Sequence, residues 1–350
     1  MVSANTELRD RALEHLHALQ RFKNGQVKSI LGMLNRDAYE PLVDELQRRL
    51  SRITAEGFDR GVESTKRLRD LVAALEDILE SGMSKAETKL TKALQDFAPV
   101  EAKAAIGQVH RLDVGLELVL PSPETLRAIV TSRPFAGELL KEHFEALTRS
   151  SQRILRRELN FGLVAGEGFD DIARRIHGAG GMLEHSRRQV RSVVGAAVQH
   201  VGNAARQATY RENEDIIAGE QFVATLDSRT CPQCQALDGQ EFPIGEGPMP
   251  PLHLGPCRCS RVPVLKSWRD LGIDADDMPE GTRASMDGEV AEGTTYPDWL
   301  ERQSEAVQDE ALGPERAALW RSGEVAIDKF VDDFGRTIPL AELARIYGLD

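Results

Sequence analysis

The chain has 350 residues, with 44 Lys or Arg against 56 Asp or Glu, so its formal net charge is −12. Hydrophobic residues make up 41% of the chain and aromatic residues 5%, which is enough apolar material for two or three soluble, helix-rich domains. No apolar run approaches the ~20 residues of a membrane span, and the N-terminal sequence MVSANTELRD lacks the basic and apolar regions of a signal peptide, so we expect neither membrane insertion nor secretion.

The charge is unevenly distributed along the chain. Residues 270–350 contain 20 acids and 7 bases, whereas residues 146–213 contain eleven Arg, no Lys and six acids. The acidic average therefore describes the C-terminal part and says little about the partners of the Arg-rich middle.

Residues 1–111 are predicted to form an N-terminal helical region. Apolar residues recur there at helical spacing, and the two clearest stripes are Leu42, Val43, Leu46, Leu50 and Ile53, and then Leu68, Leu71, Leu75 and Leu79. Gly25, the pair Ser81–Gly82 and Pro99 are expected to interrupt the helices. The region has no cluster of catalytic residue types, and such stripes are typical of a core or of contacts with partner helices.

Residues 112–220 are predicted to form a second, mostly helical region. Residues 112–123 have an extended pattern, and helices are expected from about 124, over about 137–160, over about 170–177 and over about 184–213. The Gly-punctuated stretch 160–169 and the GAGG sequence at 178–181 are expected to separate these helices.

The pattern changes at residue 221. Strand character at 221–226, 241–244 and 261–265, with five Pro between Pro243 and Pro256, predicts a small β-rich Cys/His knot over 221–268. An acidic linker is expected over 269–295 and a C-terminal helical segment over 296–350. The apolar residues of that segment are expected to pack back onto the domain rather than dock elsewhere; they include Trp299, Leu300, Leu312, Leu319 and Trp320. The predicted fold class is mainly α with a small β-rich zinc-knot insertion (α+β).

All four cysteines lie within one short segment, which favours a local metal site over a disulfide framework. With one histidine they supply five candidate ligands, of which four are expected to bind a structural Zn²⁺: Cys231, Cys234, His253, Cys257 and Cys259. The pair Asp238–Gly239 is predicted to form a hairpin turn that brings the two groups together. A small knot with few large apolar residues needs such support, and zinc contributes on the order of 10 kcal/mol in small modules.

Two other interpretations of the cysteines are open. They can be free reduced thiols, or the CPQC sequence can be a redox site, although we expect a turn and a strand after it rather than the helix that lowers a thiol pKa. A catalytic zinc needs an open coordination position and a base, whereas five soft ligands favour a closed shell, and Asp227 and Asp238 resemble strand-end and turn residues. We therefore predict that the protein is not an enzyme.

The arginine-rich helices are candidates for contact with DNA phosphates, without sequence specificity because no recognition-helix motif is present. The candidates for facing DNA are Arg153, Arg156, Arg157, Arg187, Arg188 and Arg191, within a larger cluster that also includes Arg149, Arg174 and Arg175. The interpretation we favour is that these arginines lie on solvated helix faces and pair with neighbouring acids.

The run LDSRTCPQCQALDGQEF, followed by a Pro-rich stretch, PLH and CRC, resembles the phage head morphogenesis domain of Mu F-like minor head proteins. The preceding AVQHVGNAARQATYRENEDI and the later WLERQSEAVQDEALGPERAALWRSG and FGRTIPLAELARI also fit the family pattern, so the resemblance extends over about 133–350. The sequence departs from the pattern at VVGAAVQH, where many relatives have an Arg-Thr pair.

The resemblance implies a low-copy capsid component. Such a protein would associate with the portal protein and with capsid or scaffold proteins during head assembly in the host cytoplasm, and would then lie inside the virion near packaged DNA. The alternatives are a nonspecific nucleic-acid-binding zinc module and a metal-dependent hydrolase.

Overall fold

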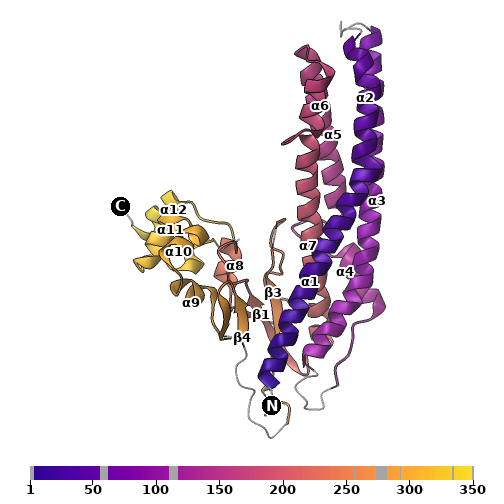
Figure 1. Ribbon diagram of the computed structural model, residues 1–350. Helices are drawn as coiled ribbons and strands as arrows, with labels where there is room; N and C mark the ends of the chain where they lie inside the picture. The colour runs from indigo at the N-terminus through magenta and orange to yellow at the C-terminus, as the bar shows by residue number, and fades with distance from the viewer. Residues whose placement is uncertain are drawn as a thin grey trace. The chain divides into compact units, whose positions relative to one another are not determined.

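The structure is a computed structural model that describes residues 4–55, 62–109, 117–255, 257–267, 269–272, 282–291, 293–332 and 335–348. Helices dominate, and the strands form one small antiparallel sheet and one hairpin, so the predicted α+β class with mainly helical content is confirmed (Figure 1). Every helix within these residues is too short or too polar to cross a lipid bilayer.

Contacts divide the chain into two compact units, each assembled from separated stretches. Unit 1 comprises Met1–Leu19, Ala98–Leu126 and Gln199–Asp350, and unit 2 comprises Gln20–Phe97 and Arg127–Val198. Three long helices contribute residues to both units: α1 (Ala4–Leu34), α3 (Val62–Val109) and α7 (Met182–Arg211). The five-part division drawn from the sequence remains a prediction.

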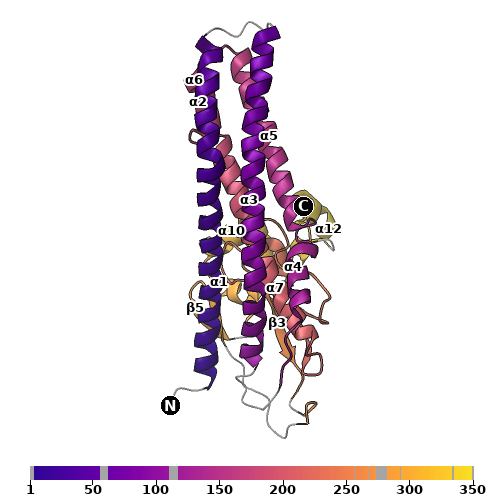
Figure 2. The ribbon, with the colours of Figure 1, turned by 90° about the vertical axis from the view of Figure 1, so that its right-hand side faces the viewer.

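Unit 2 is a helical bundle. To its shares of the three long helices it adds α2 (Glu40–Ala55), most of α4 (Pro123–Ser132), α5 (Leu140–Val164) and α6 (Phe169–His177). Figures 1 and 2 show α3 and α5 side by side. The leucines of the two predicted stripes that lie fully inside are Leu42, Leu46 and Leu50 of α2 and Leu71, Leu75 and Leu79 of α3. The helical spacing therefore identified the core-facing sides correctly.

The three interruptions predicted in the first helices are wrong. Helix α1 continues through Gly25, and α3 continues through Gly82 and Pro99. An exposed helical glycine costs only about 1 kcal/mol, and even the ~3 kcal/mol of an internal proline is offset by the packing of so long a helix. Gly82 has a packing role, because a Cβ placed on it would lie under 3.0 Å from the Cβ of Ala38.

Between α1 and α2 the chain does not break but widens into a π-helical turn, η1 (Asn35–Tyr39). Its Tyr39 side chain is buried, and the hydroxyl lies 2.9 Å from the Ser186 hydroxyl of α7, which in turn lies 3.2 Å from that of Ser151 on α5. This chain of buried hydroxyls joins three helices of unit 2.

The remaining helices follow the predicted order with shifted ends. Helix α5 extends to Val164, so the link before α6 is only 165–168, and α7 begins directly after the Gly-rich residues 178–181. Residues 117–122 are non-helical, as the extended pattern predicts, and 110–116 lie outside the described residues. The Asn213 side chain accepts a hydrogen bond from Val119 N at 2.7 Å and donates one to Val119 O at 2.9 Å.

Unit 1 contains the sheet, in which β1 (Ile217–Val223) pairs antiparallel with both β2 (Glu241–Phe242) and β3 (Ser260–Leu265). A short helix, α8 (Pro232–Leu237), lies between β1 and β2 in the chain. Where an acidic linker is expected, β4 (Thr282–Ser285) and β5 (Gly288–Ala291) form a hairpin, while 273–281 lie outside the described residues.

The C-terminal segment is helical, as predicted. It consists of α9 (Tyr296–Glu301), α10 (Glu305–Leu312), α11 (Pro314–Arg321), the 3-10 turn η3 (Ile327–Phe330) and α12 (Leu340–Tyr347). Trp299, Leu300 and Leu312 share a core with Leu226 of the knot, and Leu319 and Trp320 pack against it. The expectation that these residues pack back onto the domain is confirmed.

Candidate metal centre and arginine-rich helices

The four cysteines come from two places in the fold. Cys231 is the N-cap of α8 and Cys234 lies one turn later, so both side chains face the same side of the helix. Cys257 and Cys259 lie just before β3, which the sheet brings back beside β1. The sulfur atoms of Cys234, Cys257 and Cys259 all lie within 4.8 Å of one another, and all three residues are buried.

Cys231 and His253 are near these sulfurs but outside the group of three, and both are half-buried. Cys231 is half-buried and makes hydrogen bonds with Cys234 and with the His253 ring. Gly255 leaves room for that ring, because a Cβ on Gly255 would lie 2.9 Å from His253 Nδ1. The structure thus brings three of the five candidate ligands, Cys234, Cys257 and Cys259, to within 4.8 Å of one another, while Cys231 and His253 lie outside this group of three and their ligand role stays a prediction.

Hydrogen bonds inside the group shift its acid–base equilibria in opposite directions. The contact with the Cys234 thiol is the largest cause that lowers the pKa of Cys231, and it is also the largest cause that lowers the pKa of Cys257. The pKa of Cys234 is raised, first of all by its hydrogen bond to Cys231. The hydrogen bond to Cys231 raises the pKa of His253. Neighbouring thiols therefore share protons, and a bound cation would allow all of them to ionise.

The donor set fits a thiophilic metal. Tetrahedral Zn²⁺ with Zn–S bonds of about 2.3 Å places its sulfur ligands about 3.8 Å apart. The 4.8 Å limit on the three buried sulfurs requires a contraction of at most about 1 Å to reach that geometry. Three buried thiols of the described chain are therefore close enough to hold one metal ion.

An ion pair between the half-buried Arg258 and the buried Asp227 lies next to the cysteines in the chain and was not predicted from the sequence. The Arg258 side chain, between two of the cysteines, makes a bidentate contact with the Asp227 carboxylate, with Nη2 at 2.8 Å from Oδ1. Asp227 also accepts hydrogen bonds from the backbone N–H of Arg229 at 3.1 Å and from the Thr230 hydroxyl at 3.2 Å. The D-x-R-T-C and C-R-C motifs are thus two halves of one contact.

Asp238 has a second structural role. Its carboxylate lies 3.0 Å from Nη1 of Arg283 on β4 and accepts the backbone N–H groups of Ala224 and Tyr296, both at 2.6 Å. Asp238 ends α8 and Gly239 has a φ of 82°, so the pair joins a helix to β2. The predicted turn at this pair is present, because Gln240 N donates to the Leu237 carbonyl at 3.1 Å, but a helix rather than a strand precedes it, so it does not close a hairpin.

The CPQC sequence opens a helix, contrary to the expected turn and strand. Pro232 at the first helical position fixes φ and has no N–H to leave unsatisfied, which favours helix initiation directly after Cys231. The argument that disfavoured redox chemistry on this ground is therefore wrong. Proximity of the other cysteines and His253 is now the observation that favours metal binding.

Side chains of α7 form hydrogen bonds with the Cys knot within unit 1. Gln199 donates a hydrogen bond to the carbonyl of Cys259 at 2.7 Å, and Asn203 donates to the carbonyl of Pro250 at 3.2 Å. The Ser260 hydroxyl donates to Asn203 Oδ1 at 2.9 Å. Polar residues within the longest uncharged stretch of the chain are therefore buried contacts, which their sequence alone does not show.

Two further buried ion pairs lie in unit 1. Glu220 of β1 is fully buried, accepts from Gln207 at 2.9 Å and lies 3.4 Å from Nη2 of Arg261. Glu101 of α3 lies 3.8 Å from Nε of Arg206 on α7. Burial of such charges is tolerated only when they are paired, and the sequence gives no signal that distinguishes them from surface residues.

The arginines predicted to face DNA fall into two groups. Arg156 makes a bidentate contact with Glu76 of α3, and Arg157 pairs with Glu158 at 2.7 Å. Arg187 donates to Asn35 Oδ1 at 3.0 Å, and its guanidinium lies 5.0 Å from the centre of the Tyr39 ring. In the described part of the chain Arg153, Arg188 and Arg191 are exposed and have no such partner.

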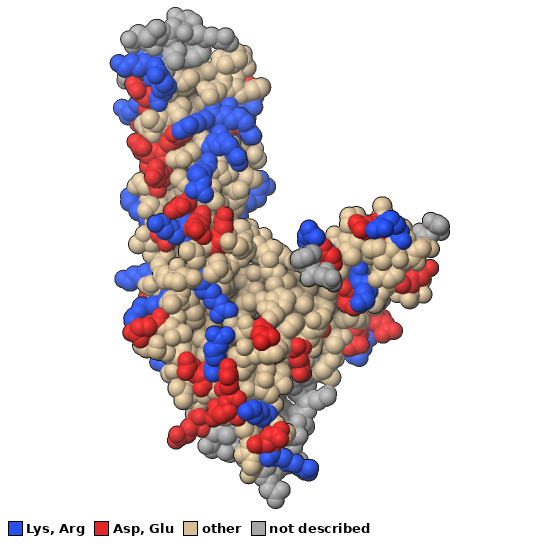
Figure 3. Space-filling view, turned by 180° about the vertical axis from the view of Figure 1, so that it is seen from behind, with Lys and Arg blue, Asp and Glu red and all other residues tan. Residues whose placement is uncertain are grey.

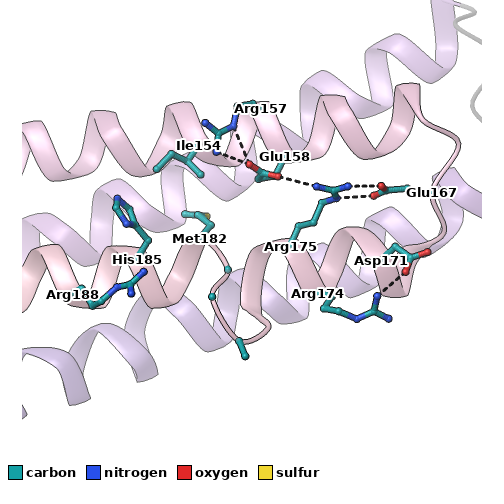
Figure 4. A pocket seen from close by; sticks show the side chains of 13 residues that line it. Ile154, Arg157, Glu158, Glu167, Asp171, Arg174, Arg175, Met182, His185 and Arg188 are labelled. Carbon is teal, nitrogen blue, oxygen red and sulfur yellow. Dashed lines mark hydrogen bonds and ion pairs between the residues drawn. The ribbon is translucent and has the colours of Figure 1, made fainter.

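The other arginines of the cluster form ion pairs with acidic side chains. Figure 4 shows a cavity of about 710 Å³ between α5, α6 and α7, where an alternating series crosses from Arg157 through Glu158 and Arg175 to Glu167. Arg174 pairs with Asp171 at 2.9 Å. On the face of unit 2 seen in Figure 3, Lys and Arg gather in the upper part with Asp and Glu among them. Pairing with neighbouring acids thus accounts for most of the cluster.

Comparison with known protein families gives one match. Residues 153–262 match the family model described as phage Mu protein F like protein. Searches among curated proteins and among solved structures each give no significant match. The matched segment begins in α5, includes the Arg-rich helices and the whole cysteine group, and ends in β3. Residues 153–262 are therefore similar to phage Mu protein F like proteins, in agreement with the resemblance noted from the sequence, while the outer parts of the 133–350 resemblance lie beyond the match.

Proposed function

From the Mu F-like segment at residues 153–262, we propose that this chain is a minor head protein of a tailed phage or prophage. It acts in head assembly and in DNA packaging or delivery, associates with the portal protein and with capsid or scaffold proteins, and remains inside the virion. The family match is the observation that carries the proposal, because it covers the most distinctive part of the structure.

A structural Zn²⁺ is the second part of the proposal. The metal would join the N-terminus of α8 to the chain before β3, two places that also share an apolar cluster around Phe222 and Ala224. Its role is to replace protons in a group of thiols that cannot all ionise side by side. The nearby carboxylates Asp227 and Asp238 are both paired with arginine, which leaves neither as a base, so we propose no catalytic role.

Nonspecific contact with DNA is a subsidiary proposal, favoured by one observation. Arg153, Arg188 and Arg191 are exposed and carry guanidinium groups that no described acid neutralises. Removal of one arginine that binds a phosphate should reduce the slope of log affinity against log salt by about 1.

The direct test of the head-protein role is co-purification. The chain, expressed with the portal protein of the same phage, should bind it, and mass spectrometry should find the chain in proheads and mature particles. Absence from both particles together with failure to bind portal would overturn the proposal. A chain that binds DNA tightly and portal not at all would instead be a nucleic-acid-binding zinc module.

Further measurements test the site assignments. Elemental analysis should find about one Zn per chain, and Cys234→Ser should lower the stability of unit 1. Metal-free protein with four freely reactive thiols would contradict the proposed zinc.

For DNA, the double variant Arg188→Ala, Arg191→Ala should lose affinity and salt dependence. Arg156→Ala, whose guanidinium is already held by Glu76, serves as the control. Equal losses from both would reject the assignment. Hydrolysis of peptide, nucleotide or DNA that an Asp227 substitution abolishes without unfolding would contradict the absence of catalysis.

A further inference from the structure

The cavity of about 710 Å³ in unit 2 is lined mainly by charged side chains, unlike the mostly apolar pockets that bind neutral small molecules (Figure 4). Its lining combines four arginines and one histidine with three acids, so its formal charge is +1 when the histidine is neutral. A ligand that fills such a cavity must itself be charged, and the balance of the free groups decides its sign.

All three acids of the lining are already paired with arginine. Arg175 on α6 lies between two of them, with Nη2 at 2.6 Å from Glu167 and Nη1 at 3.7 Å from Glu158. The third acid, Asp171, pairs with Arg174 at 2.9 Å. These pairs leave no carboxylate of the lining available for a cation, so the cavity does not suit a metal ion.

Two cationic or hydrogen-bonding side chains of the lining have no acidic partner among the described residues. His185 and Arg188 are both exposed and lie three positions apart on α7, so they share one face of that helix. Figure 4 shows them across the cavity from Ile154 and Arg157 on α5. Arg157 is 70% exposed and pairs only with the adjacent Glu158, and exposed pairs of this kind contribute little stability, so its guanidinium can turn to a ligand.

We propose that this cavity binds a phosphate group between Arg157 of α5 and Arg188 of α7, beside His185. The planar guanidinium fork matches two phosphate oxygens at once, which makes arginine the usual partner of such a group. The chemistry is the same for a phosphate of a nucleic-acid backbone and for a small free phosphate anion. The inference deepens the DNA contact proposed above by assigning one discrete site, and it depends on neither the zinc nor the head-protein role.

The glycine-rich residues 178–181 fix the two sides of the cavity relative to each other. A Cβ on Gly181 would lie 2.7 Å from the carbonyl oxygen of Arg175, so the link packs directly against the end of α6 and places α6 beside the first turns of α7. The Gly180 N–H donates to Glu184 Oε2 at 2.7 Å and is therefore already occupied. The proposed site is accordingly formed by side chains and not by the N-terminus of α7.

Isothermal titration calorimetry of the full-length chain with pyrophosphate at low salt tests the site, because so small an anion cannot extend along a helix to arginines outside the cavity. Arg188→Gln and Arg157→Gln should each weaken binding about 10-fold or more, since each removes a charge-assisted hydrogen bond. Arg191→Gln and Arg153→Gln are matched controls on the same two helices: both residues are exposed, neither lines the cavity, and both variants should bind as wild type does.

A short oligothymidylate, titrated in parallel, identifies the source of the phosphate. Greater dependence of its binding on Arg157 and Arg188 than on the controls supports the site and assigns it to a nucleic-acid backbone, whereas that dependence for pyrophosphate alone supports a site for a small anion. If neither probe distinguishes the cavity arginines from the controls, the site is overturned, although equal losses of oligonucleotide binding would leave nonspecific DNA contact in place. Absence of binding by either probe overturns both.

Modification of wild-type arginines with phenylglyoxal, mapped by mass spectrometry, does not depend on the folding of a variant. The probe that binds should protect Arg157 and Arg188 and leave Arg153 and Arg191 reactive. Equal modification of Arg157 and Arg188 with and without that probe overturns the site, and portal binding still decides the head-protein role separately.

Discussion

The contact between Gly82 and Ala38 gives the most direct test of the helical packing. Helix formation alone predicts that Gly82→Ala stabilises the protein, because alanine in a helix is favoured over glycine by about 1 kcal/mol. The structure predicts the opposite. The new Cβ would lie under 3.0 Å from the Cβ of Ala38, which is rigidly attached to the η1 backbone and cannot rotate away.

Relieving this overlap requires the two helices to separate, and overpacking of this kind costs about 1–3 kcal/mol. Gly82→Ala should therefore be neutral to about 2 kcal/mol destabilising, after the gain in helix propensity is included. Gly32→Ala is the matched control: Gly32 is exposed in α1, nothing lies within 4 Å of its added Cβ, and the substitution should stabilise by about 0.4–1 kcal/mol.

Thermal unfolding followed by far-ultraviolet circular dichroism measures both variants, with about 2–4 °C expected per kcal/mol. Adding Ala38→Gly to Gly82→Ala removes the clashing carbon, so the double variant should recover about 1–3 kcal/mol relative to the sum of the single effects. If Gly82→Ala raises the midpoint as much as Gly32→Ala does, or if the two substitutions at positions 38 and 82 are simply additive, the packing argument is refuted.

Three further substitutions follow from the described contacts. Arg187→Ala should lower the free energy of unfolding by about 1 kcal/mol in a urea titration, because it removes the hydrogen bond to Asn35 and the stacking on Tyr39. Arg188→Ala is the control and should leave the unfolding midpoint unchanged. Equal effects of the two substitutions would contradict the role given to Arg187. Burial raises the pKa of Asp227, but hydrogen bonds from Arg258 and Thr230 hold it below its usual value, so its contribution is complete above an unfolded pKa near 3.9 and is lost as the pH falls below that. Asp227→Asn should accordingly lower stability most above about pH 4, and a difference from wild type that grows in acid refutes this sign. Asn213→Asp keeps the acceptor for Val119 N but loses the donation to Val119 O, so limited proteolysis should cut residues 117–122 faster than in wild type; unchanged cutting shows that the contact is dispensable.

Element types and the core-facing helix sides could be predicted from the sequence, whereas helix continuity could not. The leucines of α2 and α3 repeat at helical spacing, and such spacing indicates a helix that buries one face. Gly82 and Pro99 are local signals for a break, but their effect depends on what packs against them. The Ala38 contact, 44 positions away in the chain, is not visible in a local pattern.

For the candidate metal site, the ligand residues could be predicted from the sequence, but the residues that hold them in place could not. Five ligand residues confined to one segment predicted a local site, because their chemistry is rare enough to be recognised without a structure. The partners that hold them could not be predicted: Asp227, Gln199 and Asn203 are common polar residues, and only the fold shows that they are buried against Arg258 and the Cys259 carbonyl. The helix at CPQC was missed because six residues are too few for a periodic signal.

The protein's own contacts hold the two sides of the cysteine group unequally. On the β3 side, Cys257 and Cys259 are already fixed by the Arg258–Asp227 pair and by the amides of α7, which need no metal. On the α8 side, Cys231 is half-buried and is held by Cys234 and His253 alone among these groups. Metal binding would therefore order the exposed half against a preformed half, which costs less conformational entropy than ordering all the ligands together. If the site binds metal, we therefore expect release to begin at the α8 edge, while the β3 side keeps its contacts.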